Sequence, residues 1–343
     1  MNHRITAEVS TKDRYFTTLP LTLTSIATQT LPPQELIIFD DGEHKDLREF
    51  DVYQHIFSLF DQKNINWQVV FGKREGQVKN HQEAINQAKN DWIFRVDDDC
   101  FLESNVLEQL ASNIEEGIGA IGPLVIDPRD VKPLPMGLTT NKITDVTAAP
   151  NIQWFKHSGK KVVEHLYSCF LFNKNASEHG YCMNLSPVGH REETIFTYEM
   201  HRNGWKLIVD AGAIVWHFRA NVGGIRSYED ENHWKHDDFI FSEKMKIWNQ
   251  EPSDKKLIIL NCGLGDHCAF GCILPELKEK YESIVIGATY PEVFEDEENI
   301  EIISVHEAEL LCNGHTDPYN VYKWMVDHDH KTSIVDAFRG MYL

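Results

Sequence analysis

Mostly apolar runs alternate along this chain with segments whose apolar residues recur at helical spacing. The run 35–39 is typical of a strand buried on both faces, and 47–60 places its apolar residues on one side of a helix. Strands are predicted at 5–10, 35–39, 67–71, 92–96, 120–126, 166–172, 206–209 and 213–216, and helices at 14–28, 47–60, 78–88, 103–111, 192–202 and 241–248. This alternation predicts an α/β fold with a mainly parallel, Rossmann-like sheet covered by helices.

Two segments interrupt the alternation. From 127 to 163 the periodicity fades among prolines and polar residues, and 219–238 is polar and carries a Gly-Gly pair, which is typical of a loop. Pro252-Ser253-Asp254 has the composition of a linker, so we predict one domain over 1–250 and a second, smaller α/β domain over 251–343. In the second domain, strands are predicted at 255–260, 283–287 and 300–304, and a helix at 269–280.

Composition narrows the functional classes. The 343 residues carry a formal net charge of −20, which disfavours nucleic acid and anionic membrane as partners, although a local basic patch would permit either. No apolar run approaches the length of a membrane span, and the start lacks the apolar core of a signal peptide. The seven cysteines show no framework spacing, so we expect free thiols and a cytoplasmic protein.

The clearest chemical signal is an acidic triplet, Asp97-Asp98-Asp99, at the end of the apolar run 92–96. Three adjacent like charges repel one another unless something compensates them. A hard divalent cation takes carboxylate oxygens and often shares them with phosphates, so the triplet indicates a metal–phosphate site. The alternative is a solvated loop whose aspartates help to cap the following helix.

A second predicted strand, 35–39, also ends in acids, Asp40-Asp41, and the first ends in Thr11-Lys12-Asp13-Arg14. Taken alone, Asp40-Asp41-Gly42 is more typical of a turn. In open α/β sheets, however, ligands bind beyond the carboxyl ends of the strands, and here three such ends carry polar groups.

Four stretches resemble the family 2 glycosyltransferases in that family's order, over about residues 4–250. They are STKDRYFTTLPLTLTSIATQTLPPQELIIFDDG, GQVKNHQEAINQAKNDWIFRVDDDC, GHREETIFTYEMHRNGWKL and VWHF. The resemblance implies the GT-A fold and a nucleoside-diphosphate sugar as donor. It also implies Mn²⁺ or Mg²⁺ as cofactor, held by a motif of two aspartates one residue apart.

The resemblance also assigns roles to individual positions. It implies that Asp99 and Asp97 bind the metal, with His217 as a further ligand; alone, His217 is more typical of a satisfied edge-strand histidine. The positions that would contact the donor nucleotide are Thr11, Asp13, Asp40, Asp41, Lys79, Asn80, Asp97 and Asp98. Arg226, in the predicted loop, is a candidate contact of the diphosphate. A carboxylate at Asp40 or Asp41 suits the N–H edge of uracil, which favours UDP.

The pair Glu192-Glu193 opens a predicted helix, where two negative charges also suit the helix dipole without any further role. In the family, this place holds Glu-Asp, and the second acid takes a proton from the acceptor hydroxyl. We therefore expect Glu193 to be the catalytic base, although its extra methylene keeps Glu192 a candidate. One base without a second nucleophilic carboxylate implies inversion at the anomeric carbon.

The last ninety residues resemble the start of a heptosyltransferase-like GT-B Rossmann domain, in GLGDHCAFGCILPELKEKY and ATYPEVFED. The third glycine of a dinucleotide fingerprint is absent, and Cys262, Cys268 and Cys272 lack the paired spacing of a zinc site. We interpret this segment as a half-domain for acceptor docking or for assembly, including homo-oligomers.

The sequence thus predicts a metal-dependent inverting glycosyltransferase acting on a hydroxyl of a glycan or glycoconjugate. Two alternatives use the same residues: transfer to a modified nucleobase of viral DNA, and a non-catalytic sugar-nucleotide binding protein. A nucleotidyltransferase would need a basic glycine-rich loop after the first strand, and Thr11 to Arg14 does not provide one.

Overall fold

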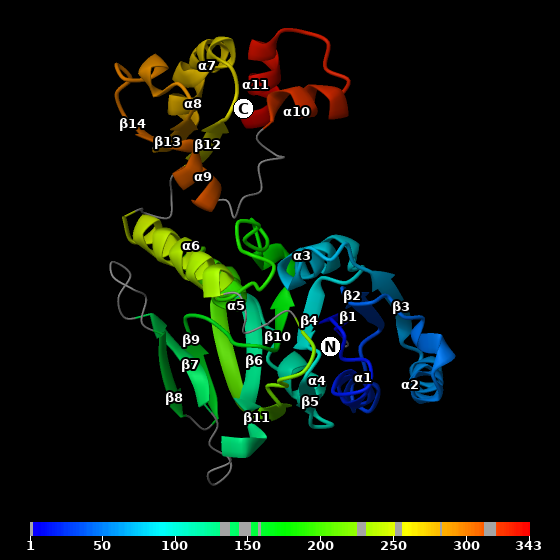
Figure 1. Ribbon diagram of the computed structural model, residues 1–343. Coiled ribbons are helices and arrows are strands. Elements are labelled where there is room, and N and C mark those ends of the chain that lie inside the picture. Colours follow the sequence, from blue (N-terminus) through cyan, green and yellow to red (C-terminus); the bar gives the residue numbers. More distant parts are fainter. Residues whose placement is uncertain are drawn as a thin grey trace. The chain divides into compact units, whose positions relative to one another are not determined.

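The computed structural model describes residues 3–130, 138–143, 152–156, 159–224, 231–250, 256–281, 283–311 and 320–343 (Figure 1). The described chain divides into two compact units. The first comprises Met1–Tyr181 and Leu185–Phe241, and the second comprises Cys182–Asn184 and Ser242–Leu343. The division falls inside one helix; the predicted domain boundary after residue 250 remains a prediction.

The first unit is built on one large sheet with the strand order β3-β2-β1-β4-β10-β6-β11-β5, and β9 pairs with β11. Its strands are β1 (Ile5–Thr11), β2 (Glu35–Asp40), β3 (Asn66–Phe71), β4 (Trp92–Asp97), β5 (Cys100–Leu102), β6 (Ile118–Ile126), β9 (Lys160–Val163), β10 (Phe170–Asn173) and β11 (Lys206–His217). β3, β2, β1 and β4 run parallel, as do β6 and β11. β10 is antiparallel to both its neighbours, β4 and β6. The predicted α/β class with a mostly parallel sheet is confirmed.

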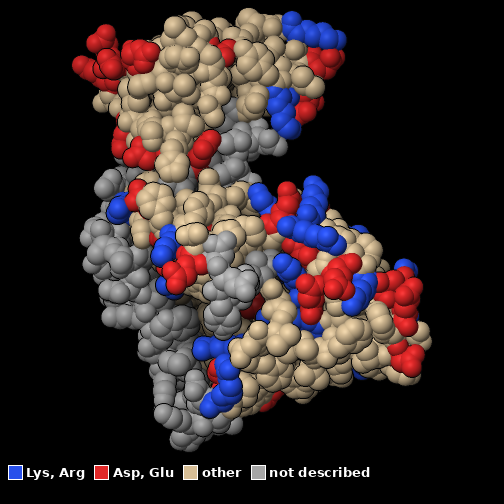
Figure 2. Space-filling model, viewed as in Figure 1, with Lys and Arg blue, Asp and Glu red and all other residues tan. Residues whose placement is uncertain are grey.

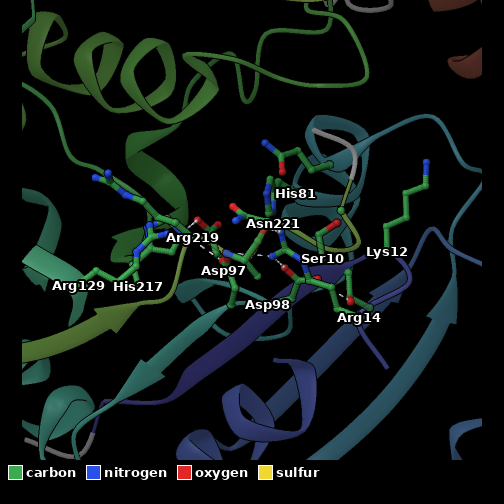
Figure 3. Close-up of a pocket in the computed structure, with 15 residues that line it drawn as sticks. Ser10, Lys12, Arg14, His81, Asp97, Asp98, Arg129, His217, Arg219 and Asn221 are labelled. Atoms are coloured by element: carbon green, nitrogen blue, oxygen red, sulfur yellow. Dashed lines mark hydrogen bonds and ion pairs between the residues drawn. The ribbon is translucent and has the colours of Figure 1, made fainter. Parts of the chain in front are cut away.

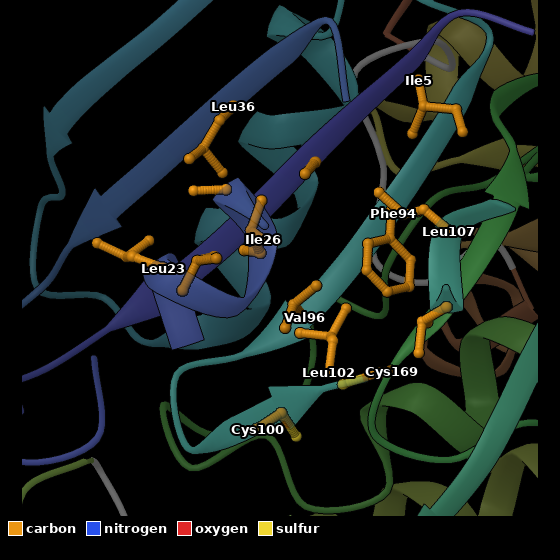
Figure 4. Close-up of a cluster of buried hydrophobic side chains, with 14 of the residues drawn as sticks. Ile5, Leu23, Ile26, Leu36, Phe94, Val96, Cys100, Leu102, Leu107 and Cys169 are labelled. Carbon is orange, nitrogen blue, oxygen red and sulfur yellow. The ribbon is translucent and has the colours of Figure 1, made fainter. Parts of the chain in front are cut away.

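Helices cover both faces of this sheet. They are α1 (Leu19–Ala27), η1 (Leu47–Glu49), α2 (Asp51–Gln62), α3 (Gln77–Gln87), α4 (Val106–Ala111), η2 (Pro128–Asp130), η3 (Lys174–Ala176) and α5 (Glu192–Arg202). On one face, the main core joins α1, α2 and α4 to apolar side chains of β1, β2 and β4, such as Phe94 (Figure 4). α3 packs on the opposite face, where Ala84 meets Ile37 and Phe39.

Several predicted elements differ in extent, for identifiable reasons. α1 begins at Leu19 rather than Arg14, with Pro20 in its first turn, where a missing N–H costs nothing. The two strands predicted at 206–209 and 213–216 form one strand with an irregularity between Asp210 and Ile214. The segment 127–163 holds β9 and a two-stranded sheet of β7 (Leu138–Ile143) and β8 (Ile152–Lys156). These strands were not predicted, because strands this short leave little periodicity.

The polar segment 219–238 is only partly a loop, because α6 (Glu231–Gln250) begins within it. The second unit has a parallel sheet, β12 (Lys256–Leu260), β13 (Ile284–Ala288) and β14 (Ile300–Ile303). Its helices are α7 (Leu264–Gly271), α8 (Leu274–Lys280), η4 (Pro291–Val293), α9 (Val305–Leu311), α10 (Val321–Asp327) and α11 (Ile334–Tyr342). The helix predicted at 269–280 is thus two helices, and α9 to α11 were not predicted.

Two surface properties bear on the functional class. Among the described residues, no helix has the length and apolar character needed to cross a membrane. On the face shown in Figure 2, basic and acidic side chains of the described residues are intermixed, without a continuous basic area. The six cysteines that the structure describes are free thiols.

Candidate active site

Strand ends of the first unit meet at one edge of the sheet. β1 lies between β2 and β4, and the register places Thr11 beside Asp40 and Ser10 beside Asp97. A pocket of about 310 Å³ opens at this edge (Figure 3). It is lined by Ser10, Thr11, Lys12, Arg14, Gln77, His81, Asp97, Asp98, Asp99, Arg129, His217, Arg219, Ala220, Asn221 and Gly224. Of the predicted site residues, it gathers Thr11, Asp97, Asp98, Asp99 and His217.

The strand pairing explains why His217 reaches the acidic triplet. β4 ends at Asp97, and a turn through Asp98 and Asp99 leads into β5, which pairs antiparallel with the end of β11. This pairing sets His217 opposite Cys100. Nε2 of His217 lies 3.1 Å from Oδ1 of Asp99 and 4.0 Å from Oδ2 of Asp97.

These three side chains fit a divalent cation. Ligand atoms at 2.0–2.1 Å from an octahedral ion lie about 3 Å apart when adjacent and about 4 Å apart when opposite. The two distances from His217 match this range, and the group Asp97, Asp99, Cys100 and His217 has all its ligand atoms within 4.8 Å. Cys100 suits the site less, because burial raises the pKa of its thiol well above the usual value.

The two outer aspartates are held ionised. Burial alone would raise the pKa of Asp97, but Arg95 and His217 together lower it. Burial likewise opposes the ionisation of Asp99, yet its contacts with His217 and Arg14 hold its pKa well below the usual range. Nδ1 of His217 is buried without a hydrogen-bond partner among the described residues, so the contact with Asp99 orients the ring.

The middle aspartate, Asp98, binds Thr11 and Arg14 rather than His217. Its Oδ2 accepts a hydrogen bond from Oγ1 of Thr11 at 2.7 Å, and its Oδ1 accepts one from Nη1 of Arg14 at 2.5 Å. The same arginine nitrogen lies 3.0 Å from Oδ2 of Asp99. Burial raises the pKa of Asp98 to about 6, against the pull of Arg14. Part of the repulsion within the triplet is therefore offset by a cation of the protein itself.

The predicted base-binding acids, Asp40 and Asp41, are buried and do not line the pocket. Asp40 is fully buried, and its oxygens accept hydrogen bonds from the hydroxyl of Tyr15 at 2.8 and 3.0 Å. Asp41 accepts from the backbone N–H groups of Arg74 and Gly76. Both carboxylates therefore tie the strand end to neighbouring turns.

The three other predicted donor contacts that the structure describes, Asp13, Lys79 and Asn80, also lie outside the pocket lining. Asp13 is exposed and accepts a hydrogen bond from the N–H of Glu43. Asn80 is buried and donates to Oγ of Ser10, which does line the pocket, whereas Lys79 is exposed on α3. Arg226 lies outside the described residues.

Glu192 and Glu193 open α5 but stand in different surroundings. Glu192 is fully buried, and its Oε1 is bound by Nη2 of Arg95. Burial raises the pKa of Glu192, although Arg95 opposes the shift. Glu193 is half-buried and lies outside the pocket lining. Of the two glutamates, only Glu193 is therefore partly exposed to solvent.

Basic residues line the same pocket, and none of them was assigned a role from the sequence. Arg129 and Arg219 lie on the His217 side of Asp97, and Lys12 lies on the opposite side in this view (Figure 3). Nε and Nη2 of Arg129 both donate to Asp127, and Nε of Arg219 is 3.6 Å from it. Positive charge beside an acidic metal cluster suits a phosphate-bearing ligand. Lys12, Arg219 and Arg129 follow the ends of β1, β11 and β6 by one, two and three residues, and this placement was the available signal.

Comparisons with known proteins give two results on family and fold. The model of the family described as Glycosyl transferase family 2 matches residues 9–174. The chain is similar in structure to GalNAc-T7 crystallised with UDP, GalNAc and Mn²⁺, with 14% identity and a TM-score of 0.50 over 73% of this chain and 52% of that one. It is also similar to S. aureus TarS, with 15% identity and a TM-score of 0.45 over 98% of this chain and 50% of that one.

This chain thus spans about half the length of either protein. Comparison with curated proteins gives no match. At 14% identity the likeness to GalNAc-T7 concerns the fold alone. The matched family segment contains the first unit's strand ends with Thr11, Asp97 and Asp99, so sequence and fold agree. Residues 9–174 thus match glycosyl transferase family 2, and this match together with the GT-A fold supports a glycosyltransferase.

Proposed function

We propose that the chain is a metal-dependent inverting glycosyltransferase that moves a sugar from a UDP-linked donor to a hydroxyl of a glycan or glycoconjugate. The observation that supports this most directly is the cluster of Asp97, Asp99 and His217 at the wall of a pocket. Its spacing suits Mn²⁺ or Mg²⁺, and its two aspartates lie in the segment 9–174 that matches glycosyl transferase family 2.

The donor diphosphate is proposed to bind on the cation side of the pocket. A cation held by Asp97, Asp99 and His217 would offset the negative charge that develops on the departing diphosphate. Arg129 and Arg219 line the same side and can add charge-assisted hydrogen bonds to phosphate oxygens. Thr11 lines the pocket, and its hydroxyl is already committed to Asp98.

Glu193 is proposed to activate the acceptor. Its carboxylate would take the proton of the acceptor hydroxyl while that oxygen bonds to the anomeric carbon and the bond to the diphosphate breaks. A single displacement of this kind inverts the anomeric configuration. Glu192 is suited to a supporting role, because Arg95 holds its carboxylate out of reach of solvent.

Uracil is proposed as the donor base, which is also the base in the UDP crystallised with GalNAc-T7. Asp40 and Asp41 already accept hydrogen bonds within the protein, so a contact with the base requires Tyr15 or the turn 74–76 to give way. Competition among the four nucleoside diphosphates for the purified protein tests this part. Preferential binding of a purine nucleotide would contradict it.

A panel of nucleoside-diphosphate sugars tests the function itself. The purified protein is incubated with each donor, with and without Mn²⁺, and release of the nucleoside diphosphate is measured by mass spectrometry. We expect release from one donor class, dependent on the cation and abolished by Asp99→Ala. Equal release without the cation, or release by Asp99→Ala at the unaltered rate, would refute the proposal.

The segment 251–343 is proposed to serve acceptor docking or assembly of the chain with itself. A cytoplasmic location is proposed on the free state of the six described cysteines. Sedimentation of the purified full chain tests the assembly part.

A further inference from the structure

Four buried polar side chains form a row across one face of the large sheet. Glu8 of β1, His81 of α3, Arg95 of β4 and Glu192 of α5 are each at most 2% exposed. Glu8 and Arg95 are direct neighbours in the register of β1 and β4. Burying a charge costs free energy unless the charge is paired, so each of these side chains depends on its neighbours in the row.

The direction of the hydrogen bonds in the row is set by Arg95. Its Nε lies 3.3 Å from Nε2 of His81, and a guanidinium can only donate. His81 therefore accepts at Nε2 and carries its proton on Nδ1, which donates to Oε1 of Glu8 at 2.7 Å. The carboxylate of Glu8 is thereby bound by His81. The guanidinium of Arg95 is left to bind the acids on its other side, Glu192 and Asp97.

At that other end, Arg95 holds both oxygens of Asp97. Its Nη2 contacts Oε1 of Glu192 and lies 3.1 Å from Oδ1 of Asp97. Its Nη1 donates to the backbone carbonyl of Ser168, and Oγ of Ser168 donates to Oδ2 of Asp97 at 2.8 Å. The guanidinium thus orients one oxygen directly and the other through Ser168.

We propose that Arg95 is a positioning residue that fixes the carboxylate of Asp97 in the pocket and ties it to the first turn of α5, which carries Glu193. The inference rests on the proposed function, in which Asp97 is a ligand of the cation. It links the binding of the cation to the activation of the acceptor. The guanidinium of Arg95 contacts both the cation ligand Asp97 and Glu192, in the helix that carries the base.

A simpler role for Arg95 would be to neutralise Glu192. The two roles predict different results for a variant in which Glu192 also loses its charge. If neutralisation is all that Arg95 does, then Arg95→Met combined with Glu192→Gln should restore every property. If Arg95 orients Asp97, the double variant should regain stability while its cation affinity stays low.

The experiment compares four full-length proteins: the unaltered chain, Arg95→Met, Arg95→Lys, and Arg95→Met with Glu192→Gln. Mn²⁺ affinity is measured by calorimetry in the presence of UDP, and stability by urea unfolding. Loss of a residue that orients a metal ligand typically lowers metal affinity about 10–100-fold, and we expect a loss of this size in Arg95→Met and in the double variant. Arg95→Lys should lose about tenfold, because one ammonium group cannot hold Glu192, Asp97 and Ser168 together.

Arg95→Lys decides the matter if Arg95→Met does not fold. Unaltered Mn²⁺ affinity in Arg95→Lys, or recovery of affinity together with stability in the double variant, would overturn the inference while leaving the proposed function intact. If the unaltered chain itself fails to bind Mn²⁺, the proposed function is refuted, and this inference with it.

Discussion

Asp98 and Asp99 are adjacent in the chain, yet the structure predicts opposite results for the same substitution. Asp99 uses both oxygens as acceptors: Oδ1 faces His217, and Oδ2 accepts from Arg14 and from the N–H of Ala220 at 2.9 Å. An asparagine offers one oxygen only. Its amide N–H groups must therefore face either His217 and the cation, or the two donors Arg14 and the N–H of Ala220. Asp99→Asn should therefore disrupt the cation site in either orientation.

Asp98→Asn should be tolerated much better. The amide oxygen can still accept from Arg14, and the hydroxyl of Thr11 can rotate to accept from the amide N–H. Burial raises the pKa of Asp98 to about 6, so a neutral side chain of the same shape suits this position. Asp98→Asn thus serves as a matched control, one residue away and with the same change of charge.

The magnitudes separate the two variants clearly. Loss of residues that merely support a metal ligand costs about 10–100-fold in affinity, so loss of a ligand should cost about 100-fold or more, which is about 2.7 kcal/mol. We expect Asp98→Asn to change Mn²⁺ affinity by less than about tenfold. Calorimetry with Mn²⁺ and UDP measures both, and circular dichroism verifies the fold. Equal losses in the two variants, or a larger loss in Asp98→Asn, would refute the assignment of Asp99 as a ligand.

Three further predictions concern the base, acid stability and the core. Glu193→Gln should lower transfer about 10²–10⁴-fold at saturating donor with donor affinity retained, and Glu192→Gln should lower it less; the reverse order would exchange their roles. Burial lowers the pKa of His165 from 6.5 to about 3, so only the unfolded chain takes up that proton, and the free energy of unfolding should fall as pH drops from 6.5 towards 3. Urea unfolding over this pH range should show a flatter profile for His165→Gln, and an unchanged profile would contradict the assignment. Phe94→Ala should cost about 3–5 kcal/mol in urea unfolding, whereas Phe71→Ala, at a side chain that is 52% exposed, should cost far less; similar costs would be inconsistent with the core described above.

The fold was predictable where local pattern and tertiary setting agree. β2 is buried along its whole length, as its apolar run predicts, and α5 ends where Gly204, with φ of +86°, terminates it. The beginning of α6 escaped prediction, although its later part was predicted at 241–248, because its first turns, from Glu231, are as polar as a loop. Periodicity reports burial, so a helix with a polar beginning has no signal there.

The candidate site was predictable in its acids and in His217, but not in the arginines that bind these acids. The strand end with Asp97 and Asp99 indicated a charged site through its composition alone. The partner of Asp98 is Arg14, which is 84 positions away in the chain, and no local pattern links the two. Arg95 is the one charged residue within the run 92–96, and a buried charge in an apolar strand was the signal that could have pointed to it.

The central place of β10 has a consequence for how the chain folds during its synthesis. β4 and β6 are complete by residue 126, but the strand that joins them is not made until residue 170. Until then, each presents an unpaired edge, and such edges readily pair with other chains. Closing the sheet brings together segments far apart in sequence, a step that is slow in folding. Newly made chains thus pass through an interval of aggregation risk that lasts until β10 is inserted and, for the other edge of β6, until β11 is made.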